Sequence, residues 1–255
     1  MLAYVDPHNC IPRTLPIVPL PHDISQRADE IECLLLTWRN SFDSFLACNT
    51  SLAQRDLIAA TQLQISHHTA KISIATYYNF FQCSYDHYLP QFITIVESAA
   101  SIIEYFKASP NHGGLRVAFY IGIIQPLHFL TLKCRDRKLR RQAIALAEQA
   151  GREGVWDGVS TAAVLRWIVA KEEENMPPYH DETYGAELSG TGVPDERDRL
   201  HRICVEFYRL ERKAMIKGMR RLDEGGWEEV VGQTDCWGPQ KDVGEEFKVV
   251  IAAFE

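Results

Sequence analysis

The sequence has few of the patterns that build metal sites, beginning with closely spaced cysteines. Of its seven cysteines, the two nearest in sequence are Cys33 and Cys48, fifteen positions apart. A structural zinc site needs cysteine pairs joined by a short loop, because only such a loop lets two thiolates reach one ion. The sequence therefore predicts no zinc cluster. An odd number of scattered cysteines is typical of reduced, buried thiols in an intracellular protein.

The chain also lacks a long uninterrupted apolar run. Its most apolar segment, residues 117–132, falls short of the roughly 20 apolar residues that a membrane span needs. Three residues interrupt this segment: Gln125, Pro126 and His128. Near the N-terminus, Asp6 and Pro7 stand where a signal peptide needs a basic start and an apolar stretch. We expect neither membrane insertion nor secretion.

Signatures of catalysis and of nucleotide binding are missing as well. The sequence has no H-E-x-x-H motif, and its glycines lack the G-x-G-x-x-G spacing of a phosphate-binding loop. The adjacent His67 and His68 would point about 100° apart on a helix, so they cannot both face one ligand. The segment 158–162 lacks the second glycine of a nucleophile elbow. We expect no cofactor, no metal site and no enzymatic activity.

What the chain does have is enough apolar material for a substantial core. Hydrophobic residues make up 46% of its 255 residues, which fits one large domain or one domain with a small appendage. The net charge of −7 makes the surface mildly acidic, and such a surface repels a phosphate backbone. The charge therefore argues against DNA binding over the whole surface, and any DNA contact would need a local basic patch. Since the sequence also lacks a zinc cluster, we expect no autonomous DNA binding from this chain.

Apolar residues recur at helical spacing through most of the first 175 residues. Between Ile24 and Phe45 they follow a 4,3 rhythm, which fits a helix packed on a core better than the seam of a coiled-coil dimer. Asp136 and Asp157 stand at N-cap positions, and Pro126 is expected to split its segment into two short helices. The predicted helices cover residues 23–45, 52–81, 88–109, two parts of 115–134, 137–150 and 159–175.

The periodicity changes after a segment rich in proline and glycine at residues 177–197. Ile203, Val205 and Phe207 alternate with polar neighbours, which favours a β-hairpin over an amphipathic helix that fits almost as well. We expect a mainly α fold, a multi-helix bundle with a small C-terminal β-hairpin. The predicted parts are an extended linker (1–22), a helical domain (23–176), a linker (177–197) and a small extension packed on the helices (198–255).

Two groups of residues are candidate sites. The first is a basic run at an expected exposed helix start, which would serve as a nuclear-import signal or interaction patch, or simply as a solvated helix face. Its cations are Lys133, Arg135, Arg137, Lys138, Arg140 and Arg141. The second is a pocket opened by the expected helix break, where a histidine and a thiol would come together. Its residues are Pro126, His128 and Cys134.

Several short segments, which follow one another between about residues 31 and 221, resemble segments of a known protein family. Leading up to the basic run, Gln125-Pro126-Leu127 precedes Lys133-Cys134-Arg135-Asp136 and Arg140-Arg141-Gln142-Ala143-Ile144. The segment Glu153-Gly154-Val155-Trp156-Asp157-Gly158 follows, and then the acidic end of a helix. In order and spacing, these segments resemble the C-terminal regulatory region of fungal zinc-cluster transcription factors, known as the fungal-specific transcription factor domain.

The resemblance implies an all-helical regulatory domain in the nucleus. In that family the region modulates an N-terminal DNA-binding cluster and contacts protein partners, as a dimer or with a transcriptional cofactor, or a small-molecule effector. The chain would then be a transcription regulator without its zinc cluster, either part of a longer factor or a separate product. Two alternatives stay open from the residues alone. One is a cytoplasmic module that binds an effector or a partner helix, and the other is an enzyme centred on His128 or on His67 and His68.

Overall fold

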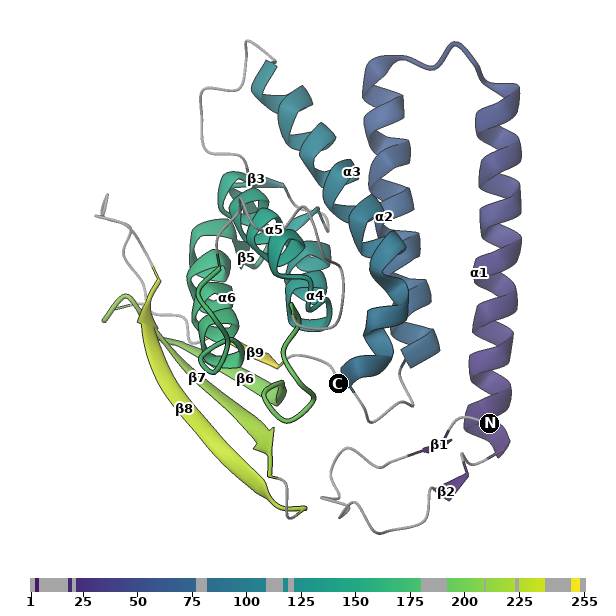
Figure 1. Ribbon diagram of the computed structural model, residues 1–255. Coiled ribbons are helices and arrows are strands. Elements are labelled where there is room, and N and C mark those ends of the chain that lie inside the picture. The colour runs from purple at the N-terminus through teal and green to yellow at the C-terminus, as the bar shows by residue number, and fades with distance from the viewer. Residues whose placement is uncertain are drawn as a thin grey trace.

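The computed structural model describes residues 3–4, 18–19, 22–76, 82–108, 117–118, 122–179, 192–208, 210–222, 225–236 and 249–252. Within these residues the chain is mainly helical and carries a small antiparallel sheet on one side (Figure 1). The predicted fold class is therefore confirmed. Several predicted features lie outside the described residues: most of the linkers 1–22 and 177–197, the ends of the second and third helices at 77–81 and 109, and the segment 237–248.

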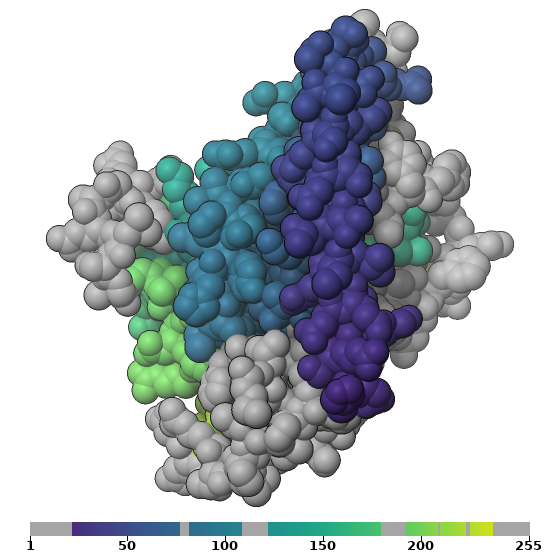
Figure 2. All heavy atoms as spheres, turned by 90° about the vertical axis from the view of Figure 1, so that its right-hand side faces the viewer, coloured from purple at the N-terminus to yellow at the C-terminus, as the bar shows by residue number. Residues whose placement is uncertain are grey.

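Two long antiparallel helices, α1 (His22–Cys48) and α2 (Gln54–Thr76), form one edge of the molecule. Helix α1 packs along α2 and lies on the outside, as Figure 2 shows. Phe42 is the only buried residue of α1, while Trp38 stacks on Phe42 and on His67 of α2, with ring centroids 4.8 and 5.0 Å apart. The apolar residues that recur at four- and three-residue spacing thus form a contact between α1 and α2, and much of α1 stays exposed to solvent.

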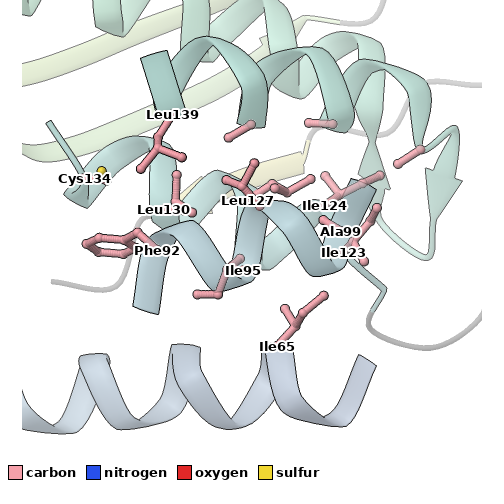
Figure 3. Packing of buried hydrophobic residues seen from close by; sticks show 14 of the residues in the cluster. Ile65, Phe92, Ile95, Ala99, Ile123, Ile124, Leu127, Leu130, Cys134 and Leu139 are labelled. Atoms are coloured by element: carbon pink, nitrogen blue, oxygen red, sulfur yellow. The ribbon is translucent and has the colours of Figure 1, made fainter. Parts of the chain in front are cut away.

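The inner helices are α3 (Leu89–Ala108), which follows the 3₁₀ helix η1 (Gln82–Tyr88), then α4 (Ile124–Lys133), α5 (Arg137–Gln149) and α6 (Gly158–Glu172). A first core lies between α2, α3, α4 and α5, where Ile65, Ile95 and Leu127 are fully buried (Figure 3). In the described part of the chain, each α-helix overlaps a span that apolar periodicity marks, so their order was predictable, whereas two helices were expected where α4 alone is found. None of the helices in the described part of the chain has the length and apolar character that crossing a membrane requires.

The predicted break at Pro126 is wrong. Helix α4 begins at Ile124, so Pro126 occupies its first turn. Proline is tolerated there because the first N–H groups of a helix have no partner within it. The carboxylate of Glu153 instead accepts hydrogen bonds from the N–H groups of Ile123 and Ile124, at 3.0 and 2.8 Å. In the described part of residues 115–134 there is one helix and the short strand β3 (Val117–Ala118).

Both predicted N-caps are confirmed. The carboxylate of Asp136 accepts a hydrogen bond from the N–H of Leu139, and that of Asp157 accepts one from the N–H of Ser160, each at 2.8 Å. Between α5 and α6 the chain turns through two short paired strands, β4 (Arg152–Glu153) and β5 (Trp156–Asp157). The two aspartates thus fix where α5 and α6 begin.

The C-terminal part forms a four-stranded antiparallel sheet with the order β8-β7-β6-β9. The hairpin of β6 (Leu200–Tyr208) and β7 (Lys213–Arg221) confirms the prediction, whereas β8 (Trp227–Asp235) and β9 (Val249–Ala252) were not predicted. One face of the sheet packs on α6 in a second core that includes Leu165 and Ile216. Near the N-terminus, β1 (Ala3–Tyr4) pairs with β2 (Val18–Pro19).

Candidate functional site

The basic run lies at the junction of α4 and α5, and most of it is buried. Lys133, Arg135, Arg137 and Arg140 are each less than a tenth exposed, and Arg140 is fully buried. Only Lys138 is exposed, and the side chain of Arg141 is 36% exposed. The prediction of an exposed basic helix start is wrong for the four buried residues. Two glutamates at the end of α6, described next, bind the three buried arginines.

Glu172, the last residue of α6, accepts hydrogen bonds from three parts of the chain: the α4–α5 connection, α5 and the start of β6. Its Oε1 atom lies 3.1 Å from Nη2 of Arg135, and its Oε2 atom lies 2.5 Å from Nη2 of Arg140. The N–H of Leu200, at the start of β6, donates to Oε1 at 2.8 Å. Burial alone would raise the pKa of Glu172, but the two guanidinium groups and this N–H outweigh burial and lower it. Glu172 is therefore a buried carboxylate anion.

Glu173 binds the second half of the run. Its carboxylate receives hydrogen bonds from Nε of Arg137 at 2.9 Å and from Nη2 of Arg141 at 2.7 Å. The guanidinium groups of Arg137 and Arg141 also lie over the ring of Tyr179, 5.3 and 4.2 Å from its centroid. Together, Glu172, Glu173 and the four arginines form what we call the arginine–glutamate cluster. It ties the start of α5 to the end of α6.

Further polar contacts connect the cluster's surroundings to η1. The guanidinium of Arg199 forms two hydrogen bonds with Asp86, at 3.2 and 2.8 Å. The carboxylate of Glu196 accepts hydrogen bonds from the N–H groups of Gln82 and Cys83, both at 2.8 Å. Lys133 lies 3.3 Å from the side-chain oxygen of Gln82. The segment that leads into β6 is therefore held against η1 beside the end of α4.

The chemistry of the cluster is that of a fixed ionic centre. Burial lowers the pKa of Arg135 to about 10, which still leaves its guanidinium charged at neutral pH. The lowered pKa of Glu172 keeps that carboxylate deprotonated. Neither group is poised to exchange a proton near pH 7, as a general acid or base must be. Arg135 and Glu172 therefore fix the elements that they join and do not form an acid–base pair for chemistry near pH 7.

The three residues of the expected pocket do not form one site. Pro126 is buried in the first turn of α4, and the thiol of Cys134 lies in the first core near Leu130 and Leu139 (Figure 3). The ring of His128 instead packs against Trp156, with centroids 5.0 Å apart. Burial raises the pKa of Cys134 to about 12 and lowers that of His128 to about 4. Neither a thiolate nor an imidazolium is favoured there at neutral pH.

The two adjacent histidines of α2 also have structural contacts. His67 stacks on Trp38, and its Nε2 atom lies 3.1 Å from the backbone oxygen of Leu35. The rings of His67 and His68 are 5.9 Å apart and nearly perpendicular, so they do not face one ligand. Burial lowers the pKa of His68. Among the described residues, no group of three histidine, cysteine or acidic side chains could hold a metal ion.

Sequence reasoning missed the partners of the basic run. Glu172 and Glu173 stand about thirty residues after the arginines and look like the acidic end of a solvated helix. One signal could have suggested these partners: a run of cations at the start of one predicted helix is followed by a pair of anions at the end of the next predicted helix.

Comparisons of this chain with protein-family models, with curated proteins and with solved structures found no match.

Proposed function

We propose that this chain is a non-catalytic regulatory module of the kind that fungal zinc-cluster transcription factors carry at their C-terminus. It would act in the nucleus through protein partners or an effector, and it would depend on another segment or protein for DNA binding. One observation carries the proposal: the segments responsible for the resemblance supply the arginines of the arginine–glutamate cluster and the aspartate caps at the starts of α5 and α6.

Each of these segments contributes a contact between elements of the fold or a helix cap. The segment that begins at Lys133 supplies Arg135 and Arg140, which bind Glu172, and Asp136, which caps α5. The later segment supplies Trp156, which packs on His128, and Asp157, which caps α6. These segments thus contribute to the contacts that join α4, α5 and α6. Segments that form contacts in the same fold are expected to occur together in one sequence. This supports reading the resembling segments as parts of one domain.

The chemistry of the alternative sites favours regulation over catalysis. The enzyme hypothesis rested on His128 or on the pair His67 and His68, and the candidate pocket placed the thiol of Cys134 near His128. The pKa of His128 is lowered to about 4 and that of Cys134 is raised to about 12. A catalytic base or nucleophile works best with a pKa near the operating pH. Regulation needs only a stable surface for a partner.

A reporter assay tests the proposal. The whole chain is fused behind an unrelated zinc-cluster DNA-binding domain, and the output of a reporter gene is compared with that of the DNA-binding domain alone. We expect the chain to raise or lower the output and a fluorescently tagged chain to enter the nucleus. Glu172→Gln should abolish the effect because it breaks the cluster, whereas Glu148→Gln, which alters an exposed pair with Arg166, should preserve it.

The proposal would be wrong if the fusion behaved like the DNA-binding domain alone and the tagged chain stayed outside the nucleus. If the Glu172→Gln variant were less stable but still changed reporter output as the native chain does, the regulatory effect would not depend on the arginine–glutamate cluster. The fusion must be shown to accumulate equally in all variants, because unequal protein levels would change reporter output for a trivial reason.

A further inference from the structure

Strand β8 is the outermost strand of the sheet. It pairs with β7 along its whole length, from Trp227 opposite Arg221 to Asp235 opposite Lys213, without a register shift. On its other side, no strand of the described part of the chain pairs with it. Figure 1 shows β8 along the outer border of the sheet, far from α1. Within the described residues, the sheet therefore ends in a regular edge of nine residues.

The register shows which backbone groups face outward. The N–H of Cys236 donates to the oxygen of Arg212, and the N–H of Leu222 donates to the oxygen of Gly226, both at 2.9 Å. In an antiparallel pair, alternate residues bond to the neighbouring strand. The even-numbered residues of β8 therefore bond to β7. The N–H and C=O groups of Glu229, Val231 and Gln233 point away from β7, at the outer edge.

The edge lacks the features that usually prevent pairing. Proteins protect edge strands with proline, lysine, bulges or very short strands. β8 contains no proline, lysine or arginine, has no bulge against β7, and is nine residues long. Its central residue Val231 is 49% exposed. Its charged residues, Glu228, Glu229 and Asp235, leave the centre of the strand uncharged.

We propose that this edge binds a second copy of the chain through antiparallel pairing of β8 with β8. The two-fold axis passes between the two Val231 residues, and the sheets of both copies become continuous. Glu229, Val231 and Gln233 of each copy exchange hydrogen bonds with Gln233, Val231 and Glu229 of the other. This inference goes beyond the proposed function and does not depend on it.

Charge selects both the register and the partner. In the register centred on Val231, Glu229 faces Gln233 and Glu228 faces Thr234, so no like charges are directly opposed. A register centred on Glu229 would place two carboxylates against each other, which is unfavourable. Each acidic side chain of the edge thus meets a side chain that can donate a hydrogen bond. The edge is complementary to itself.

Sedimentation equilibrium of the purified full chain tests the pairing. We expect a reversible monomer–dimer equilibrium that Val231→Pro weakens by about 5- to 150-fold, since proline removes one outward N–H from each copy. That N–H does not bond to β7, so an edge proline should leave the fold intact, which circular dichroism checks. Val231→Thr keeps the N–H and the strand preference, and it is expected to dimerise like the native chain.

A second pair of variants tests the register. Gln233→Lys places a cation opposite Glu229 of the other copy, whereas Gln233→Glu places an anion there. Because each dimer contains this contact twice, the lysine variant should bind about 2- to 30-fold more tightly and the glutamate variant correspondingly more weakly. The same residue is changed in both, so exposure and strand position are matched.

Three outcomes would overturn the proposal. The chain could remain monomeric at every concentration tested. It could dimerise equally well with Val231→Pro, which would place the interface elsewhere, for example on α1. Finally, the two Gln233 variants could shift the equilibrium in the same direction. A monomeric chain whose edge instead binds a lysine-rich extended peptide, with affinity that falls as salt rises, would show that the occupant is a basic partner.

Discussion

At the scale of single residues, Glu172 bonds to more parts of the chain than Glu173, the other carboxylate of the arginine–glutamate cluster. It receives hydrogen bonds from Arg135 before α5, from Arg140 within α5 and from the backbone of Leu200 in the sheet. Both ionic partners are fully buried. The interaction of a buried pair barely repays the loss of hydration, so its removal matters chiefly through the charges that remain unpaired.

Glu172→Gln should lower the free energy of unfolding by about 3 to 5 kcal/mol, because two buried guanidinium groups lose their counter-charge. Urea denaturation measures this change. The matched control is Glu148→Gln, which alters another ion pair between α5 and α6 but one that is exposed. The control should change stability by no more than about 1 kcal/mol. Equal effects of both substitutions would contradict the importance of burial.

A second residue-scale effect concerns His201, which is buried and contacts the ring of Trp227. Burial, followed by the nearby charges of Lys133 and Arg135, lowers the pKa of His201 from 6.5 to about 3. The folded protein therefore keeps this histidine neutral at a pH where the unfolded chain protonates it. Above pH 6.5 this histidine does not change the free energy of unfolding. As the pH falls from 6.5 toward 3, it lowers that free energy progressively.

We predict that His201→Gln makes the free energy of unfolding less sensitive to acid. Within that pH window, one titrating histidine contributes a slope of about 1.4 kcal/mol per pH unit. The variant should lose this slope, while the similar contribution of His128, with its pKa of about 4, remains. Urea titrations at several pH values compare the slopes. An unchanged slope would mean that His201 is already protonated in the folded protein.

At the scale of elements, the close approach of α5 and α6 depends on a glycine. Gly158 begins α6, and its N–H donates to the backbone oxygen of Gly151 at 2.8 Å. A Cβ atom added at Gly158 would collide with the backbone oxygen of Ala147 and lie 3.0 Å from that of Gly151. Backbone atoms cannot move aside as a flexible side chain can. The glycine therefore sets the spacing at the α5–α6 turn.

Gly158→Ala is expected to destabilise the protein by about 1 to 3 kcal/mol, because the added methyl group must push α6 away from α5. Thermal denaturation followed by circular dichroism measures the loss. Gly226→Ala is the control: its added Cβ would lie 3.5 Å from Leu222, an ordinary contact. If both variants melted at the native temperature, the packing at this turn would be looser than the structure indicates.

At the scale of the whole molecule, two hydrophobic cores share the same helices. Leu130 of α4 and Ala143 of α5 belong to the first core, whereas Leu132 and Ile144 belong to the second, on the sheet side. The arginine–glutamate cluster lies at the ends of these helices and bonds to β6. The inner helices and the sheet should therefore unfold as one unit. Helix α1 is joined to that unit through α2.

Hydrogen exchange followed by mass spectrometry should show this division. We expect the amides of α1 to exchange before those of α4, α5, α6 and β7, because Phe42 is the only buried residue of α1. The inner helices and β6–β7 should exchange at similar rates under native conditions. Protection of α1 equal to that of α6 would show that its exposed face is covered in solution.

The sequence by itself determined the helices, both aspartate caps and the hairpin of β6 and β7. These features depend on local periodicity and on side chains that bond to neighbouring backbone groups, so the information lies within a few residues. The same local reasoning misplaced Pro126, since a proline that would break a helix interior is harmless in a first turn. It also missed β8, whose partner strand is set by the sheet.

Only the tertiary structure decided the fate of the basic run. A run of cations is solvated unless anions meet it inside the protein, and no local pattern shows that Glu172 and Glu173 do so. The same holds for His128 in α4 and Cys134 directly after it, which pack against different neighbours. Burial and pairing depend on which distant segments come together, because desolvation and charge act through space.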